Sequence, residues 1–145
     1  MSGTLKFKRS TNPTKRLPYI GTDHFKPKHG HCLWDVPLTG DYGGGWKTGQ
    51  ALAIIALKFS KEFYEGAGGH LNTIAAAWLD RARSASPDEF ETLRGQVLGF
   101  MRAVEVAALL GLDRCDITSA AWDSNARLKE ANHGLSMRGP AEWKR

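Results

Sequence analysis

Residues 86–110 read SPDEFETLRGQVLGFMRAVEVAALL, and this stretch decides the fold because its pattern predicts one uninterrupted helix. Ser86 is the predicted N-cap, Pro87 suits the first helical position, and Glu89 completes a capping box with Ser86. Gly111 indicates where the helix ends. A helix of this length spans about 37 Å, so we expect it to be the central element of a helical domain.

The predicted central helix has two apolar faces, which means that it needs neighbours on two sides. Its bulky face consists of Phe90, Leu93, Val97, Phe100, Met101 and Val104. Its small face consists of Gly95, Gly99, Ala103 and Ala107. We interpret the small face as a contact within the chain, against the alanines at 75–77, with self-association as the alternative. The pairs Glu91–Arg94 and Arg102–Glu105 predict a solvated edge.

Three further helices are predicted on either side of the central one, at residues 47–65, 71–83 and 118–132. The third is the weakest, with Thr118 or Ser119 as its cap and a stop at His133 and Gly134. The linker at 84–86 is short, which predicts that the helices on either side of it are antiparallel neighbours. The fold class is therefore all-α: a compact domain of three main helices and a shorter C-terminal helix, with an extended basic N-terminal arm.

The domain organisation follows from these helices and from proline. Residues 1–30 contain Pro13, Pro18 and Pro27 and show no helical period, so they predict an extended or irregular arm. The apolar residues 17–20 within it are able to dock on the body. Residues 31–134 form the predicted helical domain, and residues 135–145 form a tail.

Charge is distributed unevenly along the 145 residues, whose formal net charge is +5. Residues 1–30 hold seven basic residues and one acidic residue, a net of +6, whereas residues 31–125 hold eight basic and twelve acidic, a net of −4. Residues 126–145 hold five basic and two acidic, a net of +3. Basic ends on a mildly acidic body favour an anionic partner.

Several of these basic residues stand beside aromatic residues, as in Lys6-Phe7-Lys8-Arg9 and Trp143-Lys144-Arg145. Cations bind phosphates, and aromatic rings stack on unpaired bases, but no known nucleic-acid-binding motif is present. We therefore predict docking on an acidic protein or nucleoprotein surface, with direct nucleic-acid binding as the alternative. The predicted partner-binding residues are Lys6, Lys8, Arg9, Lys15, Arg16, Lys26, Lys28, Lys144 and Arg145.

A glycine-rich segment, GGGWKTG at 43–49, precedes the predicted helix at 47–65. Backbone amides at a helix start bind phosphate well, which makes Gly44, Gly45, Lys47 and Thr48 a candidate anion site. The Walker A motif requires glycine directly before the lysine, and Trp46 stands there instead. The alternative is a turn that lets the helix start pack closely.

Histidine and cysteine gather in one short segment, with His24, His29, His31 and Cys32 close to Asp35. His70, Cys115 and His133 are candidates to complete a metal site. Structural zinc needs four ligands, and this spacing matches none of the usual patterns. Zinc or phosphate binding is a second alternative function. We assign no metal, cofactor or catalytic residue, and predict a chain that is not an enzyme.

Size and composition allow one domain with a substantial core. The two cysteines do not form a disulfide framework, no apolar run approaches the length of a membrane span, and no secretory signal is evident. These features predict a cytoplasmic protein. Small chains without a recognisable active site are often accessory or inhibitory proteins of phages and mobile elements, and that association is our functional expectation here.

Overall fold

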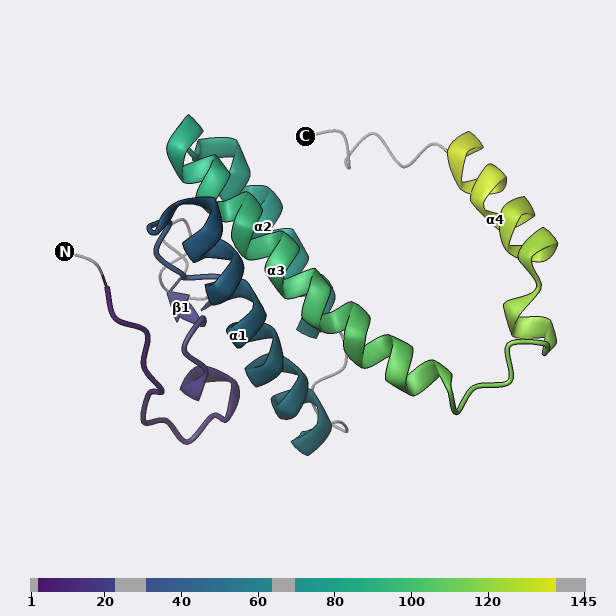
Figure 1. The fold of residues 1–145 in the computed structure, drawn as a ribbon, viewed down its shortest axis with the longest axis horizontal. Helices are drawn as coiled ribbons and strands as arrows, with labels where there is room; N and C mark the ends of the chain where they lie inside the picture. Colours follow the sequence, from purple (N-terminus) through teal and green to yellow (C-terminus); the bar gives the residue numbers. More distant parts are fainter. Residues whose placement is uncertain (1–2, 23–30, 64–69, 138–145) are drawn as a thin grey trace. The chain divides into compact units, whose positions relative to one another are not determined.

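The computed structural model describes residues 3–22, 31–63 and 70–137 and confirms the predicted all-α class (Figure 1). Four helices carry the fold: α1 (Asp41–Glu62), α2 (His70–Ser84), α3 (Pro87–Leu112) and α4 (Ser124–Ser136). The smaller elements are the 3₁₀ turns η1 (Thr14–Arg16) and η2 (Ala120–Trp122) and the strands β1 (Gly21–Thr22) and β2 (His31–Cys32). The strands pair antiparallel, with Gly21 opposite Cys32 and Thr22 opposite His31.

The chain divides into two compact units, Met1–Ala107 and Ala108–Arg145. Unit 1 contains the N-terminal arm, α1, α2 and most of α3, and unit 2 contains the end of α3, η2 and α4. The domain boundaries predicted at residues 30 and 134 stay predictions.

The start of α3 is confirmed in detail. The backbone N–H of Ser86 donates to Oε2 of Glu89 at 2.8 Å, and the N–H of Glu89 donates back to Oγ of Ser86 at 3.3 Å. These two bonds are the reciprocal pair of a capping box. The predicted end is two residues early, because α3 continues through Gly111 to Leu112. The predicted ion pairs on the solvated edge are also present, with Glu91–Arg94 at 3.5 Å and Arg102–Glu105 at 2.7 Å.

The start of α1 differs from the prediction, since the helix begins at Asp41 and not near Lys47. Gly40 precedes it with φ +93°, and Asp41 has φ +54°. The carboxylate of Asp41 accepts from the N–H of Gly44 at 3.0 Å, which caps the first turn. The glycines at 43–45 are therefore helical, although glycine disfavours helix interiors by roughly 0.5–1 kcal/mol relative to alanine.

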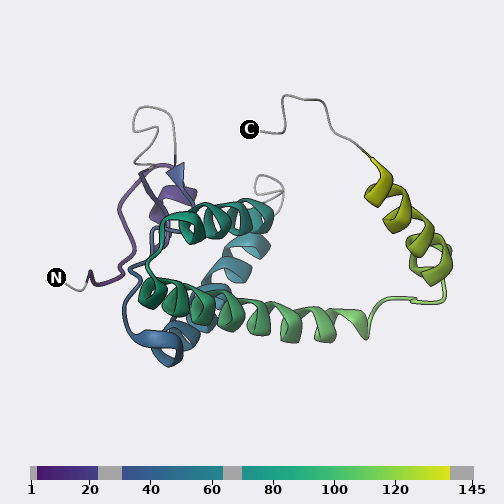
Figure 2. The same cartoon turned by 90° about the horizontal axis from the view of Figure 1, so that it is seen from above.

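Close packing between α1 and α3 explains these helical glycines. A Cβ built at Gly45 would lie 3.1 Å from the amide nitrogen of Gln96, and a Cβ at Gly99 would lie 2.9 Å from the carbonyl carbon of Trp46. Gly49 and Gly95 are equally crowded by backbone atoms of the facing helix. Two glycine pairs with four-residue spacing thus face each other, and Figures 1 and 2 show the two helices side by side. The contact is within the chain, as predicted, but its partner is α1 and not the alanines of α2.

An aromatic cluster forms the centre of the unit 1 core. The Trp34 ring is fully buried and lies 5.6 Å from the Tyr19 ring, 5.4 Å from Trp78 and 5.5 Å from Phe100, measured between centroids. The contacts of Trp34 with Trp78 and Phe100 are edge-to-face, a favourable geometry for aromatic rings. Segments far apart in the sequence, at 17–20, 34–36, α1, α2 and α3, meet in this core.

Two polar side chains hold the irregular segment at 33–38 against α2 and α3. Nε1 of Trp34 donates to Oε1 of Gln96 at 2.9 Å, and Nε2 of Gln96 donates to the carbonyl of Pro37 at 2.9 Å. The guanidinium of Arg81 donates to the carbonyls of Trp34, at 3.0 Å, and Val36. These bonds satisfy backbone carbonyls of a segment that has no regular secondary structure of its own.

The N-terminal arm is docked on the core of unit 1 from Leu17 onward. Leu17, Tyr19 and Ile20 belong to the buried core, and Leu5 packs against it. The N–H of Asp35 donates to the carbonyl of Tyr19 at 2.7 Å, so the two segments are also bonded through their backbones. The prediction that residues 17–20 dock on the body is confirmed.

Unit 2 differs from the prediction in its helix limits. The predicted helix at 118–132 is η2 followed by α4, and the cap is Asp123, whose carboxylate accepts from the N–H of Asn125 at 3.0 Å. The helix also runs past the predicted stop at His133 and Gly134, to Ser136. Of the described residues in unit 2, none is buried.

Candidate partner-binding surface on the N-terminal arm

Five of the nine predicted partner-binding residues lie together in the described part of the N-terminal arm. They are Lys6, Lys8, Arg9, Lys15 and Arg16, and all five are exposed. The other four, Lys26, Lys28, Lys144 and Arg145, lie outside the described residues.

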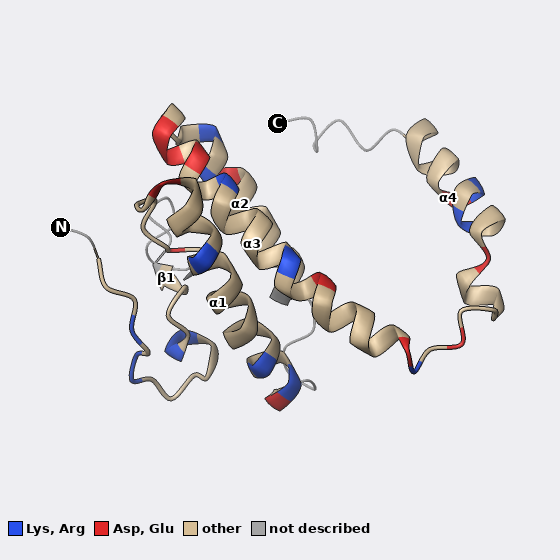
Figure 3. Cartoon of the chain, in the orientation of Figure 1, with Lys and Arg blue, Asp and Glu red and all other residues tan. Residues whose placement is uncertain are grey.

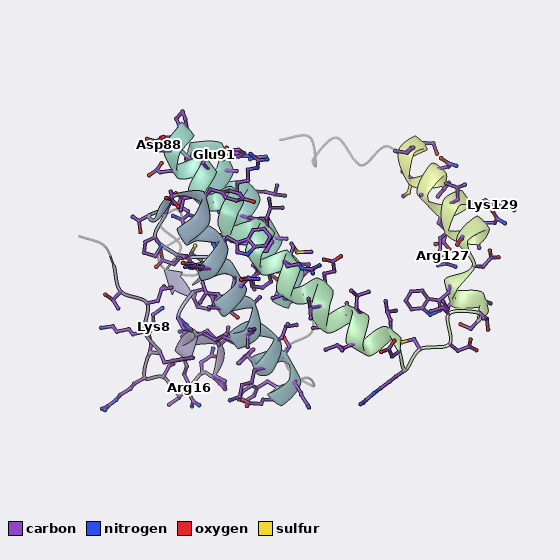
Figure 4. The ribbon with its side chains drawn as sticks, in the orientation of Figure 1. Lys8, Arg16, Asp88, Glu91, Arg127 and Lys129 are labelled. Atoms are coloured by element: carbon purple, nitrogen blue, oxygen red, sulfur yellow. The ribbon has the colours of Figure 1, made fainter. Side chains whose placement is uncertain are left out.

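Four of the five arm cations are carried by a closed loop, residues 8–16, which we call the basic loop, and Lys6 precedes it. The N–H of Lys8 donates to the carbonyl of Arg16 at 2.9 Å, so the two ends of the loop are adjacent. Nε of Arg16 donates to the carbonyl of Ser10 at 2.7 Å, across the loop. Nζ of Lys8 donates to the carbonyl of Ile20 and ties the loop to the buried part of the arm. Figure 4 labels Lys8 and Arg16 on the ribbon.

Short polar side chains shape the tip of the basic loop. Oγ of Ser10 accepts from the N–H of Asn12 at 3.1 Å, and Oδ1 of Asn12 accepts from the N–H of Thr14 at 3.0 Å. Such bonds from a side chain to the backbone two residues on are typical of Asx and Ser/Thr turns. Pro13 then leads into η1. The sequence therefore folds this segment locally, and Leu17 fixes its end in the core.

The electrostatics of the arm differ from those of the helices (Figure 3). On the helices, Lys58, Arg94, Arg102 and Arg127 each form an ion pair with a glutamate three or four residues away. Residues 3–22 hold five cations and no acidic residue, and none of the ion pairs among the described residues involves them. The described part of the arm is thus a concentration of positive charge without an acidic residue of its own.

An exposed aromatic ring stands among these cations. Phe7 is 65% exposed, although Leu5, two residues earlier, packs on the core and Leu17 is buried. Phe7 directly precedes Lys8, so the ring lies at the closed end of the basic loop, where Lys8 meets Arg16. We name Phe7 with Lys6, Arg9 and Lys15 the arm surface. A single exposed apolar residue is ordinary. Phe7 is notable because its neighbours in the chain are cationic.

The glycine-rich anion site rested on a loop that the structure does not contain. Gly44, Gly45, Lys47 and Thr48 all lie inside α1, and Gly45 is buried against α3. The capping carboxylate of Asp41 occupies the first turn and places a negative charge where an anion would bind. Anion binding by these four residues stays a prediction, now without its expected geometry. The close packing of the alternative is present, but in a helix and not in a turn.

The histidine and cysteine candidates are only partly described. His24 and His29, as well as the side chains of His31 and His70, lie outside the described residues. Cys32 is half-buried, the Asp35 side chain lies against Gly21, and exposed Cys115 donates to the carbonyl of Gly111 at 3.6 Å. In the ranges that the structure covers, no three metal-ligating side chains lie together.

The two buried polar residues of unit 1, Thr92 and Gln96, have structural partners. Gln96 bonds Trp34 and Pro37, and the hydroxyl of Thr92 donates to the carbonyl of Asp88 at 3.3 Å. The bridging roles of Gln96 and Arg81 were not predicted from the sequence. Two features of the sequence were signals for these roles: Gln96 lies on the small-residue face of α3, and Arg81 lies beside an apolar stripe.

Helix α3 also has an apolar character of its own. By length and hydropathy it meets the criteria of a membrane-crossing helix, which the search for a continuous apolar run did not indicate. Within unit 1 its N-terminal half carries the core residues Leu93 and Phe100 and the polar bridge Gln96. The core helix of a soluble protein passes the same test, and 22% of the apolar window of α3 is buried.

Unit 2 presents a second exposed surface, which is apolar. Leu128 and Leu135 stand seven residues apart on α4 and are 60% and 86% exposed. Trp122 and Met137 are 49% and 66% exposed. The spacing of the two leucines places them on one face of α4, but this face carries no feature that identifies what covers it.

No protein family, curated protein or solved structure matches this chain at a significant level. The arm is the part of the chain that bears on function, because a folded loop, cations without an ion pair among the described residues and an exposed ring occur in one continuous segment.

Proposed function

We propose that this chain is a binding protein that docks through its N-terminal arm on an anionic macromolecule. The observation that supports the proposal is the concentration of cations in the arm: its five described basic residues form no ion pair among the described residues, whereas Lys58, Arg94, Arg102 and Arg127 on the helices each have a glutamate partner. Five positive charges in one short segment repel one another, and an anionic partner relieves that repulsion. An acidic protein surface and a nucleoprotein both meet this requirement.

The folded shape of the arm supports a role in binding a partner more than a role in keeping the protein soluble. A disordered basic tail pays the full entropy of ordering when it binds. Here the bonds of Lys8 to Arg16 and of Arg16 to Ser10 close the loop, and Leu17 anchors it. A part of the conformational entropy is therefore lost when the protein folds and not when it binds, which favours specific docking.

The absence of catalysis and a cytoplasmic location are parts of the same proposal. A role as an accessory or inhibitory protein of a phage or mobile element fits a small chain that acts by docking. Zinc or phosphate binding stays an alternative, with the candidate phosphate-binding residues inside α1 and no three candidate metal ligands together among the described residues.

The experiment compares two charge-reversal variants of equal net charge. The arm variant carries Lys6→Glu, Arg9→Glu and Lys15→Glu, three exposed residues without a bond that closes the loop. The control variant carries Lys58→Glu, Lys61→Glu and Arg83→Glu, three exposed residues on α1 and α2. The nuclease-treated protein is titrated by fluorescence anisotropy against labelled poly-glutamate and labelled oligo-dT at about 50 to 200 mM salt.

The arm variant is expected to lose affinity for at least one of the two polyanions by tenfold or more, while the control variant keeps most of its affinity. Equal losses in the two variants would mean that net charge alone attracts the probes. If wild-type protein bound neither polyanion at low salt, the proposed function would be wrong.

A further inference from the structure

We infer that the anionic partner is a single-stranded nucleic acid, with one unpaired base stacked on Phe7 and its phosphates bound by Lys6, Arg9 and Lys15. This inference rests on the proposed function and adds the class of partner. It comes from the one feature of the arm surface that charge does not explain, namely the exposed ring of Phe7.

The position of Phe7 favours a base as its partner. The ring is 65% exposed and has Lys6 and Lys8 as chain neighbours, with Arg9 next. Proteins that bind single strands combine this pattern, a cationic track for the backbone and aromatic rings for the bases. Stacking on an aromatic ring accepts every base, because each base has a π-face.

An acidic protein surface would make less use of Phe7. The face of an aromatic ring carries the negative part of its quadrupole, so it does not attract carboxylates. Lysine and arginine alone suffice for a carboxylate surface. The ring would then remain exposed in the complex, or would need an apolar patch within the acidic surface.

Duplex nucleic acid also fits the arm surface less well. The bases of a duplex are stacked on each other, and a ring reaches their faces only after unstacking, which costs a few kcal/mol per step. Single strands and unpaired loops present their bases without this cost. The inference therefore predicts a preference for single strands at equal phosphate number.

The arm surface is also held in place on both sides of Phe7. Leu5 packs on the core before it, and the bond from Lys8 to Arg16 and the burial of Leu17 fix the chain after it. The cations Arg9 and Lys15 therefore belong to one folded loop, and the ring of Phe7 lies next to its closed end. A fixed stacking ring loses little freedom when a base binds.

The test uses Phe7→Ala in the full chain, with Phe90→Ala as the matched control and Phe7→Trp as the rescue variant. Phe90 is 46% exposed on α3 and stands between Glu89 and Glu91, so it is an exposed phenylalanine in acidic surroundings. Fluorescence anisotropy measures the affinity of each variant for labelled oligo-dT, for a labelled duplex of the same length and for labelled poly-glutamate.

Phe7→Ala is expected to weaken oligo-dT binding about 5- to 150-fold, the range for loss of one stacked base. The slope of log affinity against log salt should stay the same, because no phosphate contact is removed. Phe90→Ala should bind like wild type, and Phe7→Trp should restore affinity. The duplex should bind less tightly than oligo-dT.

The possible failures are distinguishable. Binding of poly-glutamate without binding of oligo-dT would overturn the inference and leave the proposed function intact. The inference would also be overturned if Phe7→Ala bound oligo-dT with unchanged affinity, or if the wild-type protein bound the duplex more tightly than oligo-dT. Loss of binding to every probe in wild-type protein would overturn both.

Discussion

Gly49 on α1 lies directly against the backbone of Gln96 on α3, with no room for a side chain between them. A Cβ at Gly49 would lie 2.8 Å from the carbonyl carbon of Gln96 and 2.9 Å from the amide nitrogen of Phe100. Backbone atoms cannot move aside as the end of a flexible side chain can. The spacing of α1 and α3 therefore depends on this glycine and on its counterparts Gly45, Gly95 and Gly99.

The first prediction is that Gly49→Ala destabilises the protein despite the higher helix propensity of alanine. Overpacking a tight contact costs typically 1–3 kcal/mol and occasionally more, which outweighs the gain of about 1 kcal/mol from propensity. We expect a net loss of about 2 kcal/mol in the free energy of unfolding. Urea denaturation followed by far-UV circular dichroism measures it.

Gly111→Ala is the matched control for this prediction. Gly111 is also helical, but a Cβ there would meet nothing within 4 Å. Alanine should therefore keep its propensity advantage, up to about 1 kcal/mol. If Gly49→Ala were as stable as Gly111→Ala, the close approach of the two helices would not contribute to stability.

These glycines also show how far the sequence could predict the fold. The start of α3 was readable because Ser86, Pro87 and Glu89 act locally, and the structure contains their capping box. The start of α1 could not be predicted, since three consecutive glycines resemble a loop when their packing partner is unknown. Gly45 and Gly49 matched the spacing of Gly95 and Gly99, but proximity in the chain favoured α2 as the partner.

The candidate site was also predictable only in part. The concentration of arm cations was visible from composition alone, whereas the backbone bond from Lys8 to Arg16 that closes the loop was not. The bridges made by Gln96 and Arg81 join segments about 45 to 60 residues apart, as in the bond from Gln96 to Pro37. No local pattern encodes such a contact.

The second prediction concerns Gln96, which bridges the Trp34 indole and the Pro37 carbonyl. Gln96→Leu leaves both groups unpaired in the core, and each unsatisfied group costs about 1–3 kcal/mol. We expect a loss of about 2–5 kcal/mol in urea denaturation. Gln50→Leu on α1, a half-buried position, is the control and should cost much less. Similar costs would show that the bridge is dispensable.

The same position allows a test by pH. In Gln96→Glu, burial raises the pKa of the new carboxyl above its usual value of about 4.3. The neutral carboxyl can accept from Trp34 and donate to Pro37, whereas the carboxylate has no proton to donate. A raised folded-state pKa means that stability is present at low pH and is lost as pH rises. Relative to wild type, the variant should therefore be more stable at about pH 5 than at about pH 8. A stability difference between variant and wild type that does not change with pH would contradict the bridging role of residue 96.

The third prediction concerns Tyr19, whose side chain is fully buried beside Trp34. Burial raises the pKa of the Tyr19 phenol well above its ordinary value of about 10. In the unfolded chain the phenol ionises near pH 10, and in the folded chain it stays neutral. The unfolded state therefore binds fewer protons, and stability falls as pH rises above about 10.

Tyr19→Phe should remove this part of the alkaline loss. The measurement is the difference in unfolding free energy between about pH 8 and pH 11, because that difference cancels any constant cost of the substitution. Tyr42→Phe, at a tyrosine that is 39% exposed, is the control and should behave like wild type. The same alkaline loss in Tyr19→Phe and wild type would assign the effect to other groups.

The last prediction compares two neighbouring tryptophans of the core. The rings of Trp34 and Trp78 meet edge-to-face at 5.4 Å, and both also contact Phe100. Their indole N–H groups differ: that of Trp34 donates to Gln96, whereas that of Trp78 is buried and has no acceptor among the described residues. A buried donor without an acceptor is costly, so removing it recovers free energy that removing a bonded donor does not.

Trp34→Phe and Trp78→Phe make the same chemical change, so their difference isolates the hydrogen bond. Each loses part of an indole ring, but Trp34→Phe also leaves Oε1 of Gln96 unpaired, while Trp78→Phe removes an unsatisfied group. We expect Trp34→Phe to cost about 2 kcal/mol more in urea denaturation than Trp78→Phe. Equal costs would mean that the Trp34–Gln96 bond adds nothing to packing, and a larger cost for Trp78→Phe would show that its indole N–H has a partner in solution.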